Sequence, residues 1–130
     1  MILLDTHVVL WLAFDQARIS RKARTAIEGA RTKNEGLAIS DITLLEIATL
    51  ERKRRITLRS TLETFLSDIE ARFIILPITA RVCVRALGFG SSFPDDPADR
   101  VIAATALVEG ISLVTADAAI RRSKALPTIW

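Results

Sequence analysis

Apolar residues in this chain occur in short continuous runs that are separated by longer amphipathic stretches. Four such runs have the length and the β-branched or leucine-rich character of strands, and they cover residues 1–4, 37–39, 73–76 and 112–115. Residues 127–130 form either a fifth strand or a tail. Runs that are apolar at consecutive positions indicate strands covered on both faces of a sheet.

The stretches between these runs have apolar residues at helical spacing. Helices are predicted over residues 5–14, 21–33, 42–55, 57–69, 79–87, 97–109 and 118–123. The helix at 97 is the most clearly marked, because Pro97 suits a first helical position and Gly110 suits the residue after the last. Asp96 and Asp99 then stand at the N-cap and N3 positions of a capping box.

The order of these elements alternates between strands and helices. Alternation of this kind predicts an α/β fold with a parallel sheet and helices on both faces. We therefore expect a three-layer sandwich in which a central, mainly parallel sheet of four or five strands is flanked by helices. No linker, internal repeat or low-complexity tract divides the chain, so residues 1–130 are expected to form a single domain.

Composition narrows the class of protein further. Half of the residues are hydrophobic, yet the longest apolar run, residues 8–14, is far shorter than the ~20 residues of a membrane span. The start of the chain lacks a basic segment and is interrupted by Asp5, unlike a signal peptide. Cys83 is the only cysteine, which excludes an internal disulfide and fits a reducing cytoplasm.

The distribution of basic residues favours a polyanionic partner. The net charge is +3, from 18 basic and 15 acidic residues. Four consecutive cations, Arg52, Lys53, Arg54 and Arg55, form the densest basic run. Such a run either contacts RNA or an acidic protein segment, or is simply the solvated end of a helix.

Acidic residues from four separate segments are expected at one edge of the sheet. Asp5 and Asp117 directly follow the first and fourth predicted strands, and Glu46 lies early in the helix after the second. Asp96 and Asp99 begin a helix that opens onto the same edge. Each acid alone is explained as a helix cap or a rim residue, but ligands of parallel sheets bind at this edge. An all-oxygen cluster selects Mg²⁺ or Mn²⁺, which polarises a phosphoryl oxygen and acidifies a bound water.

Four pieces of the sequence carry a family resemblance. They are residues 3–12 (LLDTHVVLWL), 40–47 (SDITLLEI), 96–106 (DPADRVIAATA) and 113–117 (LVTAD). They occur in the family order and span nearly the whole chain. In these pieces the chain resembles PIN-domain ribonucleases, and within that group the VapC toxins of type II toxin–antitoxin pairs.

The resemblance implies an endoribonuclease that needs Mg²⁺ or Mn²⁺, forms homodimers and is inhibited by a small antitoxin. The acid quartet of the family corresponds here to Asp5, Glu46, Asp99 and Asp117. Asp99 is chosen over Asp96 because the third acid of the family stands three residues before the Ile-Ala-Ala piece, which leaves Asp96 as an auxiliary acid. Thr6 and Thr115 resemble the hydroxyl positions that support the site.

Individual roles follow from this assignment. Asp5 and Asp99 are expected to bind the metal directly, whereas Glu46 and Asp117 bind a second metal or orient the attacking water. Arg100 either faces phosphate or serves as a salt-bridge partner. His7 is expected to be a partly buried helix residue, not a catalyst. The apolar helix faces in residues 42–66 are expected to form the antitoxin groove.

Other functions remain as alternatives at this stage. A non-catalytic RNA- or protein-binding module can share the same fold. A phosphatase of the haloacid-dehalogenase type needs a second aspartate where this chain has His7. A signalling receiver domain needs paired acids after its first strand, but Asp5 is followed by Thr6. The intact acid set favours the nuclease.

Overall fold

A computed structural model describes all residues, 1–130, and contains one central parallel sheet. Its strands lie in the order β3-β2-β1-β4-β5, with every neighbouring pair parallel. The strands are β1 (Ile2–Leu4), β2 (Leu37–Ser40), β3 (Ile74–Leu76), β4 (Leu113–Val114) and β5 (Thr128–Ile129). The parallel sheet is thus confirmed, and the last residues form its fifth strand.

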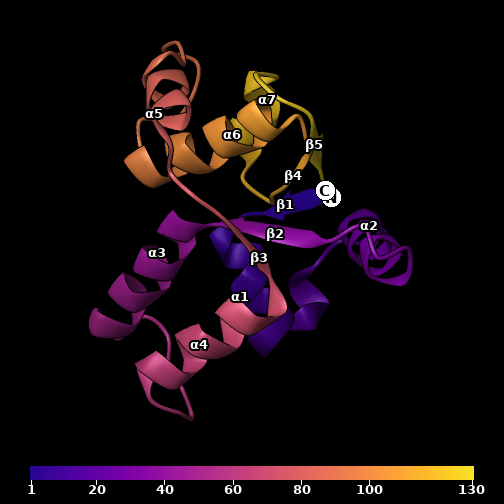
Figure 1. The fold of residues 1–130 in the computed structure, drawn as a ribbon, viewed down its shortest axis with the longest axis vertical. Coiled ribbons are helices and arrows are strands. Elements are labelled where there is room, and N and C mark those ends of the chain that lie inside the picture. Colours follow the sequence, from indigo (N-terminus) through magenta and orange to yellow (C-terminus); the bar gives the residue numbers. More distant parts are fainter.

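Helices cover both faces of the sheet (Figure 1). They are α1 (Thr6–Phe14), α2 (Arg21–Thr32), α3 (Asp41–Arg52), α4 (Leu62–Arg72), α5 (Ala80–Leu87), α6 (Pro97–Glu109) and α7 (Ala118–Ser123), with a 3₁₀ turn at Gln16–Arg18. Helices α1 to α4 gather on one side, whereas α6 and α7 lie on the other and α5 packs beside α6. The predicted three-layer arrangement is confirmed. None of these helices combines the length and the apolar character that crossing a membrane requires.

Consecutive residues of one strand pack into two different hydrophobic clusters, one on each face of the sheet. Leu3 and Leu4 are both 0% exposed but belong to different hydrophobic clusters. Leu4 packs in the cluster of α1, α2 and α3, whereas Leu3 packs with residues of α6 and α7. Because neighbouring side chains on a strand point to opposite faces, a strand buried on both sides must be apolar at every position.

Three predicted helix boundaries were wrong: the end of α3, the start of α4, and the end of α4, which lies at Arg72 instead of residue 69. Helix α3 ends at Arg52, because Arg54 adopts a left-handed conformation with φ 57° and the Arg55 N–H donates to the Leu50 carbonyl at 2.9 Å. This is the Schellman pattern, here made without glycine. Helix α4 begins at Leu62, where the Thr61 hydroxyl accepts the N–H of Thr64 at 3.2 Å. Its N-cap therefore lies four residues after the predicted start at residue 57.

The strand order creates a natural place for a ligand beside β1. From β1 the chain proceeds outward to β2 and β3, and then returns to place β4 and β5 on the other side of β1. Connections diverge at such a reversal and leave a crevice at the carboxyl ends of the two strands. Asp5 follows β1 and Thr115 follows β4, so both stand at this crevice.

Candidate active site

The structure brings together acidic side chains from four separate segments. Asp5 precedes α1, Glu46 lies in the second turn of α3, Asp99 lies in the first turn of α6 and Asp117 caps α7. The carboxylates of the other three all lie close enough to raise the pKa of Asp99. The expected convergence at the carboxyl edge of the sheet is therefore present in the structure.

Asp5 is the most rigidly held of the four. Its side chain is 8% exposed, Oδ1 accepts the Thr6 N–H at 2.8 Å, and Oδ2 accepts the Thr115 hydroxyl at 2.7 Å. The Thr115 hydroxyl oxygen also accepts the Asp117 N–H at 3.1 Å. Burial raises the pKa of Asp5, and the hydrogen bonds from Thr115 and Thr6 oppose that rise. These contacts hold the carboxylate in one orientation between β1 and β4.

Glu46 is held by a hydroxyl of the neighbouring helix. The Thr6 hydroxyl donates to Glu46 Oε1 and lies 3.1 Å from the Thr43 hydroxyl. Burial raises the pKa of Glu46, and the hydrogen bond from Thr6 opposes that rise. The nearby negative charge of Asp5 raises the pKa of Glu46 further. The contact of Thr43 was not predicted, although its position three residues before Glu46 on one helix indicates a shared face.

Asp99 differs from the others because its carboxylate accepts no hydrogen bond within the protein. Asp96 caps α6 as predicted, with its Oδ1 accepting the Asp99 N–H at 3.1 Å, but Asp99 does not complete the capping box. Burial raises the pKa of Asp99 to about 7. Four nearby carboxylates add to the rise, those of Asp5, Asp96, Asp117 and Glu46. The cluster therefore holds more negative charge than its surroundings neutralise.

No salt bridge compensates this charge. The single ion pair joins Arg100 to Asp95 at 3.6 Å and leaves the four acids unpaired. Carboxylate oxygens in excess are the donors that Mg²⁺ and Mn²⁺ prefer, so the chemistry of the site fits such an ion. No three acidic, histidine or cysteine side chains are grouped closely enough to hold a metal as they stand. Asp99, free of hydrogen bonds, is the side chain that is able to turn.

Arg100 has a structural role in the loop before α6. Its guanidinium donates to the carbonyls of Pro94 at 2.9 Å and Phe89 at 3.0 Å. Three longer bonds of 3.4 Å reach the carbonyls of Ala86, Gly90 and Phe93. Of the two predicted roles, phosphate contact or an internal partner, the structure favours the second, because these five carbonyls and Asp95 occupy the N–H groups.

Arg100→Ala is expected to lower the free energy of unfolding by about 2–4 kcal/mol, because it leaves several loop carbonyls without a charged donor. Thermal and urea denaturation of the two proteins measure this loss. Arg121→Ala, at an exposed position of α7, is the control and is expected to change stability by less than about 0.5 kcal/mol. Equal stability of Arg100→Ala and the wild type is the contrary result.

The free energy of unfolding of the metal-free protein is expected to fall as pH rises from about 4 to about 7. Asp99 ionises near 3.8 in an unfolded chain and near 7 in the folded protein. Between these values the folded state binds more protons than the unfolded state. Asp99 therefore does not reduce the free energy of unfolding below this pH window and reduces it fully above the window. Melting curves of wild type and Asp99→Asn in EDTA are expected to diverge across the window. A gap that is independent of pH speaks against the raised pKa.

Two other predictions concern basic residues, of which one group lies away from the acids and one residue lies beside them. The basic residues Arg52, Lys53, Arg54 and Arg55 are exposed at the far end of α3 from its capped N-terminus. His7 is exposed, not partly buried as expected, because it points outward from the first turn of α1. Sequence reasoning missed its position beside the site, where its charge lowers the pKa values of Asp5 and Glu46.

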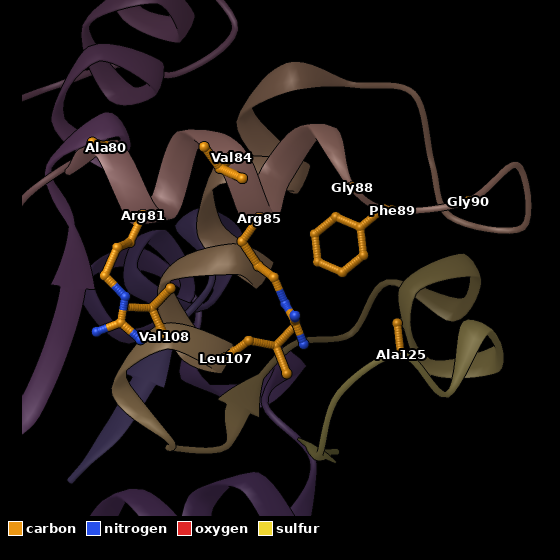
Figure 2. A pocket seen from close by; sticks show the side chains of 10 residues that line it. All are labelled: Ala80, Arg81, Val84, Arg85, Gly88, Phe89, Gly90, Leu107, Val108 and Ala125. Atoms are coloured by element: carbon orange, nitrogen blue, oxygen red, sulfur yellow. The ribbon is translucent and has the colours of Figure 1, made fainter.

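A large hollow of the surface lies apart from the acidic site. It measures about 990 Å³ and lies between α5, the end of α6 and Ala125. Figure 2 shows the side chains of Arg81 and Arg85 extending from α5 into this hollow, above Leu107 and Val108. Leu107 follows Asp99 by about 12 Å along the helix, and no acid lines the hollow. It offers a surface for a partner instead of a place for the predicted chemistry.

Comparison with known proteins places the chain in a family. Residues 2–126 match the PIN domain. The chain is 37% identical over 131 residues to Ribonuclease VapC22 of Mycobacterium tuberculosis, which covers 99% of this chain and 98% of that protein. Among solved structures, the VapBC2 complex of Rickettsia felis bound to promoter DNA has a TM-score of 0.73 at 20% identity, over 98% of this chain and 97% of that one. VapBC-1 of nontypeable Haemophilus influenzae has a TM-score of 0.69 at 19% identity, over 98% and 96%. The structural likenesses show the shared fold, and the match over residues 2–126 shows that the chain belongs to the PIN domain family.

Proposed function

We propose that this protein is a Mg²⁺- or Mn²⁺-dependent endoribonuclease that acts as the toxin of a toxin–antitoxin pair. The single observation that carries the proposal is the uncompensated charge at Asp99, which is half-buried among four other carboxylates. The relative from Mycobacterium tuberculosis is named a ribonuclease, which supports RNA as the substrate. A divalent cation offsets this charge and makes the same pocket attractive to a phosphodiester.

Each acid has a distinct part in the proposed reaction. A bound Mg²⁺ or Mn²⁺ supplies charge neutralisation at the phosphate and a water of lowered pKa. Asp5 holds the ion from a fixed position, since both of its oxygens are already oriented by hydrogen bonds. Asp99 would also hold the ion, in its ionised form. Glu46 and Asp117 bind a second ion or orient the attacking water.

The same fold also supports a protein partner. Several solved structures of the same fold are toxin–antitoxin or VapBC complexes, among them one from Salmonella typhimurium. A hollow of about 800 Å³ lies between α1, the end of α2 and α4, with apolar side chains such as Leu12, Phe14 and Phe65. Arg31 and Arg72 stand at the same hollow. We assign this groove to an amphipathic, acidic antitoxin segment. Of the stretch predicted for this role, residues 42–66, only Phe65 contributes to it.

Self-association is proposed through a different surface. Val84 and Leu87 on α5 are 75% and 85% exposed, and Leu45 on α3 is 64% exposed. Exposed large apolar side chains are typical of a surface that a second subunit covers. A homodimer therefore remains part of the proposal.

We propose that the protein acts in the cytoplasm, where the free thiol of Cys83 stays reduced.

Sequencing of RNA ends after induced expression tests the proposed function most broadly. Wild type is expected to produce new RNA ends at a small set of sites, and Asp5→Asn is expected to produce none. Purified protein with synthetic RNA spanning those sites then separates cleavage from indirect effects. RNA that is bound but left intact in the presence of Mn²⁺ favours the alternative, a non-catalytic RNA-binding module.

A further inference from the structure

Thr43 is a buried threonine near Glu46 that has no role in the proposed function. Thr43 is 0% exposed and lies on α3 one turn before Glu46. Its hydroxyl oxygen is 3.1 Å from the hydroxyl oxygen of Thr6, and it has no other hydrogen-bond partner. Thr6 is therefore the protein group that satisfies the Thr43 hydroxyl proton.

The number of protons fixes the direction of this contact. A threonine hydroxyl has one proton to donate, and Thr6 donates its proton to Glu46 Oε1. Towards Thr43, the Thr6 oxygen is therefore only an acceptor, and Thr43 is the donor. The three side chains form a directed chain in which Thr43 donates to Thr6 and Thr6 donates to Glu46.

We propose that Thr43 is a positioning residue for the active site, because its hydroxyl fixes the Thr6 rotamer that holds the Glu46 carboxylate at the acid cluster. Without the Thr43 donor, the Thr6 hydroxyl oxygen loses its only donor within the protein. Thr6 then gains by turning towards another partner, and its proton leaves Glu46. A hydrogen-bonded chain also strengthens each of its bonds, so loss of the first weakens the second. This role rests on the proposed nuclease function.

Two substitutions at Thr43 separate the hydroxyl from the space that it fills. Thr43→Val keeps the branched shape but removes the hydroxyl, whereas Thr43→Ser keeps the hydroxyl. Thr105→Val is the matched control, because Thr105 is 1% exposed and donates to the Val101 carbonyl at 2.7 Å in α6. The control reports what the loss of any buried hydroxyl does to the protein.

Thr43→Val is expected to lower kcat for RNA about 10- to 100-fold, as loss of a supporting partner commonly does. KM is expected to stay within about twofold of the wild type, because Thr43 is fully buried and touches no RNA. Thr43→Ser is expected to restore most of kcat. Thr105→Val is expected to match Thr43→Val in melting temperature but to keep the wild-type kcat.

Crystal structures of the metal-free variants supply a readout that is independent of activity. In Thr43→Val, Glu46 is expected to leave Thr6, and in Thr43→Ser it is expected to stay. Retention of the Thr6–Glu46 hydrogen bond in Thr43→Val, or an equal loss of kcat in Thr43→Ser, overturns the proposal. A wild-type protein that cleaves no RNA counts against the nuclease function alone, because the crystal structures still decide the role of Thr43.

Discussion

Asp99→Asn is expected to lower the rate of RNA cleavage by at least about 10²-fold, the usual loss when one preorganised electrostatic group is removed from an active site. The amide has nearly the same shape as the carboxylate but binds a hard cation far more weakly. Because Asp99 makes no hydrogen bond with its side chain, the substitution breaks no side-chain hydrogen bond of the fold. The loss of activity is therefore expected without a loss of structure.

The same substitution is expected to raise the melting temperature of the metal-free protein at pH 8. The pKa of Asp99 rises from 3.8 to about 7, so its ionised form is costly at this pH. Asp99 is only half-buried, and solvent screening reduces the gain from its removal to about 1–2 kcal/mol. For a chain of this size that is several degrees in melting temperature.

Asp95→Asn is the matched control for both effects. Asp95 lies in the same loop, its side chain is fully exposed, and it pairs with Arg100 at 3.6 Å. It is expected to keep wild-type cleavage and to change the melting temperature by about a degree or less. An Asp99→Asn protein that cleaves RNA normally, or that melts several degrees lower, refutes the proposed role of Asp99 and favours a simple structural acid.

Removal of divalent metal is expected to have the second large effect. With EDTA, cleavage is expected to disappear, because the acids then repel the phosphate that they are proposed to process. Addition of Mn²⁺ at about 100 times its dissociation constant is expected to stabilise the folded protein by about 2.7 kcal/mol. The reason is that the proposed ion would bind only the folded arrangement of Asp5 and its neighbours.

Titration of Mn²⁺ followed by thermal melting and by cleavage measures both consequences in one series. The stabilisation by Mn²⁺ is expected to be much smaller in Asp99→Asn, whereas Asp95→Asn behaves like the wild type. Ca²⁺, which takes more ligands at longer distances, is a useful comparison ion. Full cleavage in EDTA contradicts the metal-dependent mechanism directly.

The fold was predictable because the strands are apolar at nearly every position. Leu3 and Leu4 face different cores, so a two-sided sheet leaves a continuous hydrophobic run that is visible in the sequence. The carboxyl-edge position of Asp5 and Asp117 followed from the same reasoning, since Asp5 directly follows β1 and Asp117 lies three residues after the end of β4. The capped start of α6 at Asp96 was also found, because its signals are local.

The features that were missed have no local signal in the sequence. Four of the five carbonyls around Arg100 belong to a loop whose path no local pattern specifies, and the fifth, that of Ala86, belongs to α5. The end of α3 depends on a left-handed Arg54, a conformation that sequence signals assign to glycine or asparagine. The contact between Thr6 and Thr43 joins two helices that are 37 residues apart in the chain.

An anomalous difference map from crystals grown with Mn²⁺ measures most directly whether far-apart acids serve one ion. The account predicts a peak between Asp5 and Asp99, with Asp117 or Glu46 nearby and the Asp99 side chain turned towards the ion. A map without a peak at the crevice beside β1 and β4, while Mn²⁺ supports cleavage in solution, would contradict it.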